Sequence, residues 1–221
     1  MGLLNKFSRK RNKPSDTIVP ALSSQEAVTR AMRNMAKGAP IAVAKAGAEI
    51  ATALNTVETA ILAIDAISDQ LIEAELLADT ARDTESVGRR ALIANRYIAL
   101  LDKISDTVCR SAHNGMNLLD GIQTVYEIKL DADDRASIIL HGANVTVDAG
   151  GLGLTRPQEA FASLVEIERT IAEIDAARRT TSRVADLFSD SAAVLAERLS
   201  RLDQDFGPNA AIASQPSGAA H

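Results

Sequence analysis

The 221-residue sequence is poor in the residues that build disulfide frameworks, metal sites and wide globular cores. It has one cysteine and no tryptophan, and aromatic residues make up 3% of it. The single cysteine, Cys109, excludes an internal disulfide framework. The three histidines are scattered along the chain and form no ligand group with it: His113, His141 and His221. We therefore expect no metal, no cofactor and no catalytic residue, and a protein that is not an enzyme.

Long apolar runs are also lacking, although hydrophobic residues make up 46% of the chain. No run approaches the roughly 20 residues needed to span a bilayer, so we expect no transmembrane segment. The first residues lack the apolar segment of a secretory signal peptide. The hydrophobic share consists mainly of Ala, Ile, Leu and Val, which suit thin seams between helices better than a core built around rings.

Charge is distributed unevenly along the chain. The formal net charge is −5, yet the first thirteen residues hold five basic residues and no acid: Lys6, Arg9, Lys10, Arg11 and Lys13. Residues 1–21 have the composition of a disordered basic leader. Three interpretations stay open, namely weak contact with an anionic surface, an export signal, and a solubilising arm. Specific nucleic-acid recognition is not expected, because Phe7 is the one aromatic residue available for stacking.

An apolar rhythm of three- and four-residue steps recurs in three segments. An average step of 3.5 residues forms a narrow stripe that another helix can cover. The stripe residues are Ile50, Leu54, Val57, Ile61, Ile64, Leu71 and Ala78, then Val87, Ala91, Ala94, Ile98, Leu101 and Val108, then Ala160, Leu164, Ile167, Ile171 and Ile174. The pattern predicts a mainly α fold, an elongated antiparallel helical bundle or coiled-coil rod over residues 49–206.

Capping and breaking residues set the expected boundaries. Ser23 and Glu26 have capping-box spacing and predict a short amino-terminal helix over residues 23–37. That helix and a linker rich in small residues together occupy residues 22–48.

Three long helices follow, of which the second folds back antiparallel on the first. Their predicted ranges are 49–82, 86–112 and about 157–203. The third begins near Pro157, because proline is favoured in a first helical turn. Residues 207–221 have no periodicity and predict a disordered tail.

Between the second and third helices the period changes to the alternation typical of strands. Residues 125–130, 136–140 and 145–147 are bounded by Asp, Gly and Asn clusters and predict two or three short antiparallel strands. We therefore expect a β-hairpin insert at about 122–154. The pair Asn114-Gly115, just before it, is a strong turn signal.

Five collinear segments resemble the conserved helical core of bacterial flagellin. They are SQEAVTRAMRNMAKG at 24–38, Glu75-Leu76 with Ala78, LLDKISDTVCRSAHNGMNLLDG at 100–121, YEIKLDADDRASIILHGANVTVDAGGLGL at 126–154 and LAERLSRLDQDF at 195–206. The chain resembles the family without its outer variable domains and without its carboxyl-terminal assembly helix.

The resemblance implies a structural protein, a subunit or accessory component of the bacterial flagellar filament. It implies other flagellin-like subunits or flagellar proteins as partners, an export chaperone, and type III export to the extracellular flagellum. The alternative is a non-polymerising intracellular relative that binds a chaperone, a regulator or a membrane surface.

Four features that invite a chemical role have simpler structural interpretations. Cys109 fits a position beside a helix seam, and His113 fits a turn. The acidic cluster at 131–134 lacks the glycine and the glutamate of a calcium loop. The glycines of 150–153 lack the lysine of a phosphate-binding loop and fit turns better.

Function is therefore expected to reside in buried seams and exposed helix faces. Each fully buried Ile, Leu or Val stabilises the fold by about 1.5 to 3 kcal/mol. Charged residues on the outer faces are expected to set lateral register through weak, salt-sensitive contacts. Those assigned to the outer faces are Asp65, Asp69, Glu73, Arg82, Arg89, Arg90, Glu166, Arg169 and Glu173.

Overall fold

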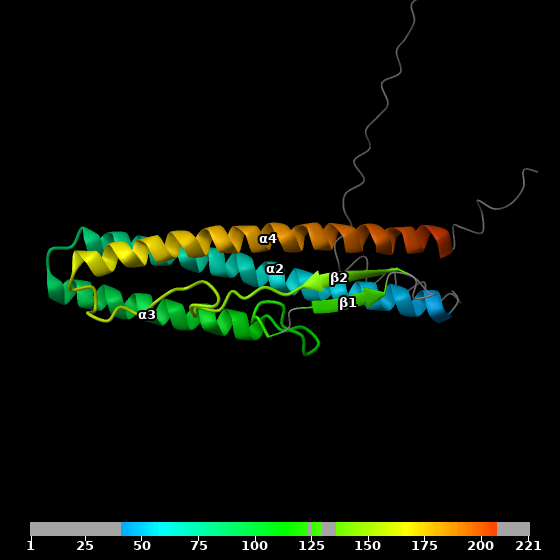
Figure 1. The fold of residues 1–221 in the computed structure, drawn as a ribbon, viewed down its shortest axis with the longest axis horizontal. Helices are drawn as coiled ribbons and strands as arrows, with labels where there is room; N and C mark the ends of the chain where they lie inside the picture. Colours follow the sequence, from blue (N-terminus) through cyan, green and yellow to red (C-terminus); the bar gives the residue numbers. More distant parts are fainter. Residues whose placement is uncertain (1–40, 123–124, 130–135, 207–221) are drawn as a thin grey trace, which may run out of the picture.

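The computed structural model describes residues 41–122, 125–129 and 136–206 (Figure 1). The elements in chain order are α2 (Ile41–Arg82), α3 (Val87–Arg110), β1 (Val125–Lys129), β2 (Ser137–His141) and α4 (Leu164–Phe206). The predicted leader, the helix at 23–37 and the tail lie outside the described residues. For the described part, the prediction of a mainly α bundle with a small antiparallel hairpin is confirmed.

α2 is the central element of an elongated bundle. Its 42 residues make it about 63 Å long at a rise of about 1.5 Å per residue. α4, with 43 residues, packs along α2, whereas α3, with 24, reaches along only part of it. α3 and α4 both run in the direction opposite to α2 (Figure 1). Two helices from the front of the chain and one from the back thus form the expected rod.

The predicted apolar stripes form the buried core of this rod. Buried stripe residues are Ile50, Leu54, Val57, Ile64, Leu71 and Ala78 in α2, Ala94, Leu101 and Val108 in α3, and Ile167 and Ile174 in α4. Val87 and Leu164 are exposed because each is the first residue of its helix. The rhythm therefore identified the inward face of all three helices.

The hairpin packs against α2 beyond the end of α3. β1 and β2 pair antiparallel, with Glu127 opposite Ile139, and β1 contacts α2. Successive side chains of a strand point to opposite faces. Ile128 and Leu140 are accordingly buried, whereas their neighbours Glu127 and Ile139 are exposed. The short hairpin thereby provides apolar cover where a longer α3 would otherwise be needed (Figure 1).

The Asn-Gly turn after α3 is confirmed. Asn114 and Gly115 have φ angles of 51° and 77°, in the left-handed region. A two-residue hairpin turn with positive φ at both central positions favours this pair of residues. His113 and Met116 flank the turn and exchange backbone hydrogen bonds of 2.8 and 2.9 Å.

The predicted start of the first long helix is wrong, and of the two or three strands predicted the described residues contain two. α2 begins at Ile41 and not at 49, because the stretch assigned to a linker is rich in alanine, the best helix former. The segment 145–147 is not a strand. Carbonyl groups of this segment instead accept backbone hydrogen bonds of 2.7 and 2.9 Å from Leu152 and Leu154, which fold it into a local loop.

Candidate assembly surface

A long segment without regular helix or strand, residues 142–163, connects the hairpin to α4, and we call it the strap. It runs back along the bundle towards the start of α4 (Figure 1). Its side chains Leu152, Leu154 and Phe161 are buried in the common core. The strap is therefore an integral layer of the rod rather than a surface loop.

The strap exists because α4 begins at Leu164 and not near Pro157, as predicted. The Ser163 hydroxyl accepts a hydrogen bond from the backbone N–H of Glu166 (3.3 Å). Serine followed three residues later by glutamate is the capping-box spacing. This cap determines where the helix starts, and Pro157 remains in the strap.

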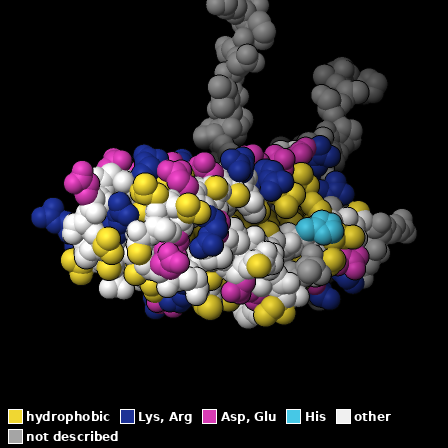
Figure 2. All heavy atoms as spheres, turned by 60° about the vertical axis from the view of Figure 1, so that its left-hand side comes forward, with side chains coloured by type: hydrophobic (Ala, Val, Ile, Leu, Met, Phe, Trp, Pro, Cys, Tyr) yellow, Lys and Arg dark blue, Asp and Glu magenta, His cyan; other side chains and the backbone are white. Residues whose placement is uncertain are grey.

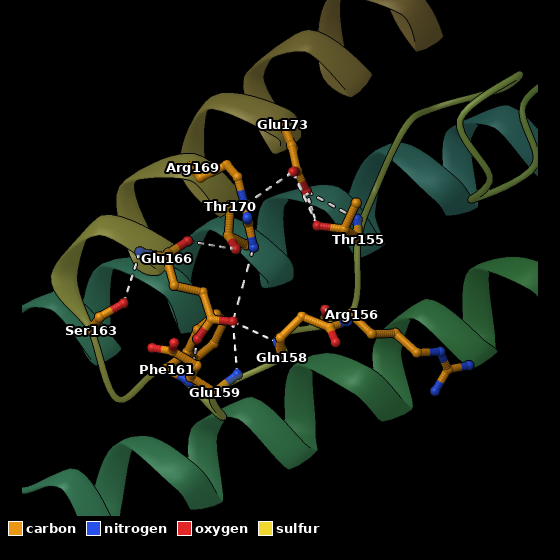
Figure 3. A network of polar contacts seen from close by, with 10 residues as sticks. All are labelled: Thr155, Arg156, Gln158, Glu159, Phe161, Ser163, Glu166, Arg169, Thr170 and Glu173. Atoms are coloured by element: carbon orange, nitrogen blue, oxygen red, sulfur yellow. Dashed lines mark hydrogen bonds and ion pairs between the residues drawn. The ribbon is translucent and has the colours of Figure 1, made fainter.

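Glu166 also fastens the strap to α4 (Figure 3). Its carboxylate accepts backbone hydrogen bonds from Gln158 (2.5 Å), Glu159 (3.0 Å) and Phe161 (2.9 Å). Glu166 is only 5% exposed, and a buried carboxylate needs such donors to replace its lost hydration. The three N–H groups are occupied by the protein's own side chain, so this cluster holds the fold together.

Further polar contacts tie the strap to the helices on either side of it. The hydroxyl and the backbone N–H of Thr155 donate to the Glu173 carboxylate of α4 at 2.8 and 3.0 Å (Figure 3). Arg156 forms an ion pair with Asp102 of α3. The strap thus bridges α3 and α4.

Two non-glycine residues of the strap have left-handed backbone. The φ angles of Ala160 and Phe161 are 51° and 62°, a conformation that costs about 1 to 2 kcal/mol per residue. The Phe161 ring is fully buried beside Tyr97, with 5.7 Å between ring centroids. Burial of such a ring stabilises by about 1.5 to 3 kcal/mol, which is enough to offset the strain at its own position.

Three charged residues expected to be free on the outer faces instead bond to the strap, which corrects that prediction. Glu166 and Glu173 hold the strap, and Arg90 donates to the carbonyl oxygens of Thr84 (2.5 Å) and Ala162 (3.1 Å). The sequence placed these side chains on helices but did not show that the strap packs over them. The expected outer-face residues that are exposed are Asp65, Asp69, Glu73, Arg82, Arg89 and Arg169.

The residues considered for a chemical role do not form a common site in the described structure. Cys109 is exposed and free, and His113 lies in the turn described above. A Cβ at Gly151 would come within 2.2 Å of the Thr146 carbonyl oxygen, so this glycine serves close packing within the strap. The acidic cluster at 131–134 lies outside the described residues. Among the residues that are described, no group of three or more His, Cys, Asp or Glu could hold a metal ion.

α2 also corrects the expectation about apolar runs. Within the described part of the chain, Val43–Arg82 is long and apolar enough to cross a membrane by length and composition alone. Half of its most apolar stretch is buried inside the bundle, as in a core helix. On the face of the molecule drawn in Figure 2, basic and acidic side chains alternate with hydrophobic ones.

Comparison with known proteins identifies a solved structure with a similar fold. No protein-family model and no curated protein matches the sequence. The crystal structure of Bacillus cereus flagellin is similar to this structure, with a TM-score of 0.60 and 21% sequence identity over 69% of this chain and 86% of that chain. The chain has a flagellin-like fold. At this level of identity the similarity concerns the fold, and it agrees with the resemblance found in the sequence.

The flagellin-like fold leaves the outer faces of its helices as the surfaces available for contact. The buried polar groups of the strap network are engaged with one another, and the seams are filled by aliphatic side chains.

Proposed function

We propose that this protein is a structural, flagellin-like component of the bacterial flagellar filament, as a subunit or an accessory protein. The observation that carries the proposal is the flagellin-like fold, which spans most of the matched flagellin chain. The mechanism is burial of apolar surface between helices rather than catalysis.

The partners that follow from this proposal are other flagellin-like subunits or flagellar proteins, with an export chaperone before assembly. The location that follows is the extracellular flagellum, reached by type III export. Exposed charged residues on an elongated rod would give weak, salt-sensitive lateral contacts.

Fractionation of the source bacterium tests the proposal. We expect antibodies against the protein to label sheared, purified filaments in immunoblots and by immunogold electron microscopy. A cytosolic protein of known abundance serves as the control for contamination. Recovery from the cytosol or membranes alone would contradict a filament role and would favour the non-polymerising alternative.

A deletion of residues 1–21 tests whether the basic leader acts in export or anchoring. We expect the deletion to move the protein from the filament fraction to the cytosol. Circular dichroism of the purified variant would show whether the helical rod is retained. An unchanged distribution would leave the leader as a solubilising arm.

A further inference from the structure

The side of α2 that faces away from the core carries large aliphatic side chains in contact with solvent. Leu62 is exposed by 69%, Leu76 by 62% and Ile72 by 45%. Acidic residues lie between them at steps of three and four residues, so the whole set follows one side of the helix. We call this set the outer stripe. Its members, all exposed, are Leu62, Asp65, Asp69, Ile72, Glu73 and Leu76.

The charge of the outer stripe is of one sign. Between Lys45 and Arg82, α2 contains acidic residues and no basic one, whereas α4 contains acids and arginines along its whole length. Within the described residues, Asp65, Asp69 and Glu73 form no ion pair. A helix face that combines exposed aliphatic side chains with acids of this kind suits an occupant that is both apolar and basic.

The leader, residues 1–21, has the complementary composition. Its first thirteen residues combine five basic residues and no acid with three large apolar ones, Leu3, Leu4 and Phe7. No stretch of equal length elsewhere in the chain has so large an excess of basic over acidic residues. Charge and apolar contact therefore both favour the leader as the occupant of the outer stripe.

The leader can reach the outer stripe of its own molecule. Asp69 follows Ile41, the first residue of α2, by 28 residues, which is about 42 Å along the helix. Lys13 precedes Ile41 by the same 28 residues. A chain of that length has a typical end-to-end distance of about 30 Å as a coil. With residues 23–37 in the helix predicted for them, it still extends to about 65 Å.

We propose that the leader docks on the outer stripe of α2 within the same molecule, antiparallel to the helix. Because the leader is tethered to the start of α2, Lys13 lies nearest Asp65 and Leu4 lies nearest Leu76. The tether gives the leader an effective concentration of about 1 mM at this surface, which favours it over the leader of a second copy in dilute solution. The contact covers the exposed aliphatic side chains of the free chain, and release of the leader uncovers them.

Distances between spin labels on the purified full-length chain test the docking. One label is placed on the leader by Asn5→Cys in a Cys109→Ser background. The second is placed at either end of α2, by Glu85→Cys or by Lys45→Cys, both at exposed positions. A docked leader holds residue 5 about 20 Å from residue 85 and about 45 Å from residue 45.

A leader that does not dock stays centred on its attachment at the start of α2. The distances are then broad, and the label at position 45 is the nearer one. We expect pulsed electron resonance to give the shorter, narrower distance for position 85. The reverse order would overturn the proposal.

Removal of the acidic charges tests which surface the leader occupies. The neutral variant is Asp65→Asn/Asp69→Asn/Glu73→Gln. The matched control makes the same charge change at exposed acids of α4, as Glu168→Gln/Asp175→Asn/Asp186→Asn. We expect the neutral variant to lower the docked population at least about threefold and the control to leave it unchanged. Equal losses in the two variants would overturn the assignment to α2.

Salt provides a second measure of the same contact. At about 0.5 M salt, charges are screened over a few ångströms, so the wild type should lose the docked population as the neutral variant does. A docked population that is insensitive to salt would contradict the role of charge. Circular dichroism of every variant separates loss of docking from loss of the helical rod.

A mixture of singly labelled molecules tests whether docking occurs within one molecule. One protein carries the label at position 5 and the other at position 85. We expect no short distance between them, because each leader occupies its own α2. A short distance in the mixture would show that leaders dock on neighbouring molecules and would overturn the proposal. All of these measurements use the isolated chain, so their outcome is independent of whether the protein occurs in filaments.

Discussion

The ionisation of Tyr97 differs between the folded and the unfolded chain. Its side chain is buried, and its hydroxyl has no hydrogen-bond partner in the described part of the structure. Burial raises the pKa of Tyr97 above its ordinary value, and the negative charge of Glu173 raises it further. The folded state therefore holds this proton more tightly. The resulting stability is present below about pH 10 and is lost as the pH rises above it.

Tyr97→Phe tests this linkage. At pH 7 we expect the variant to be as stable as the wild type or slightly more stable, because it removes an unsatisfied buried hydroxyl. Above about pH 10 the wild type should lose up to about 1.4 kcal/mol per pH unit relative to the variant. Urea unfolding from pH 8 to 11 measures both curves. Parallel curves for the two proteins would contradict the buried phenol.

Glu166→Gln tests the fastening of the strap. The substitution replaces a carboxylate oxygen by an amide group that cannot accept a hydrogen bond from the strap. We expect a loss of about 1 to 3 kcal/mol of unfolding free energy and faster hydrogen exchange at the Phe161 amide. The matched control Glu168→Gln, exposed on the same helix, should change stability by less than about 0.5 kcal/mol. Equal effects of the two substitutions would show that Glu166 is an ordinary surface acid.

Glu166 illustrates which contacts of a single residue the sequence can predict and which it cannot. Ser163 and Glu166 have readable capping-box spacing, which alone would have corrected the start of α4. The three N–H groups that Glu166 binds belong to a strap whose path depends on tertiary packing. By contrast, the burial of Ile64 and Leu71 could be predicted because it follows from a local period.

For the strap as an element, backbone strain at two residues lowers a stability that burial and hydrogen bonds provide. Ala160 has a φ of 51°, which glycine adopts without steric cost. We expect Ala160→Gly to raise the unfolding free energy by up to about 1 kcal/mol, as relief of strain exceeds the added entropy of the unfolded chain. The matched control Ala162→Gly lacks such strain and should destabilise by about 0.4 to 1 kcal/mol. Destabilisation by both changes, measured in urea, would contradict strain at position 160.

The hairpin offers a test of its alternating faces. Ile128 is buried on the inner face, whereas Ile139 of the adjacent strand is exposed by 53%. Ile128→Ala should cost about 2 to 5 kcal/mol through loss of apolar burial and the cavity left behind. Ile139→Ala deletes the same atoms and should cost less than about 0.5 kcal/mol. Thermal unfolding measures both, and equal losses would contradict the observed register.

Elements with a period were predictable, and the element without one was not. The helix rhythm and the strand alternation predicted the ends of α2, α3, β1 and β2 to within two residues, except for the start of α2, which lies eight residues earlier than predicted. The strap has neither period, and Pro157 suggested a helix there because proline suits a first turn as well as a loop. The segment 145–147 misled for a related reason, since three alternating residues are too few to separate a strand from a loop held by its own backbone.

At the scale of the whole molecule, two long helices connect the two ends of the rod. α2 and α4 run through both the end that contains the α2–α3 turn and the end that contains the hairpin (Figure 1). Because each end is held to these same helices by one core, local opening at one end removes support from the other. We therefore expect the rod to unfold as a single cooperative unit.

The two tyrosines of the chain can test this, because the sequence contains no tryptophan and only two tyrosines. Tyr97 lies on α3 beside Phe161 near the start of α4, and Tyr126 lies on β1. Tyr126→Phe and Tyr97→Phe each leave one fluorescent reporter, at opposite ends of the rod. After correction of each variant for its own stability by circular dichroism, both reporters should give the same urea midpoint as the helical signal. Two distinct midpoints would show that the hairpin end and the turn end unfold independently, and that α2 does not couple them.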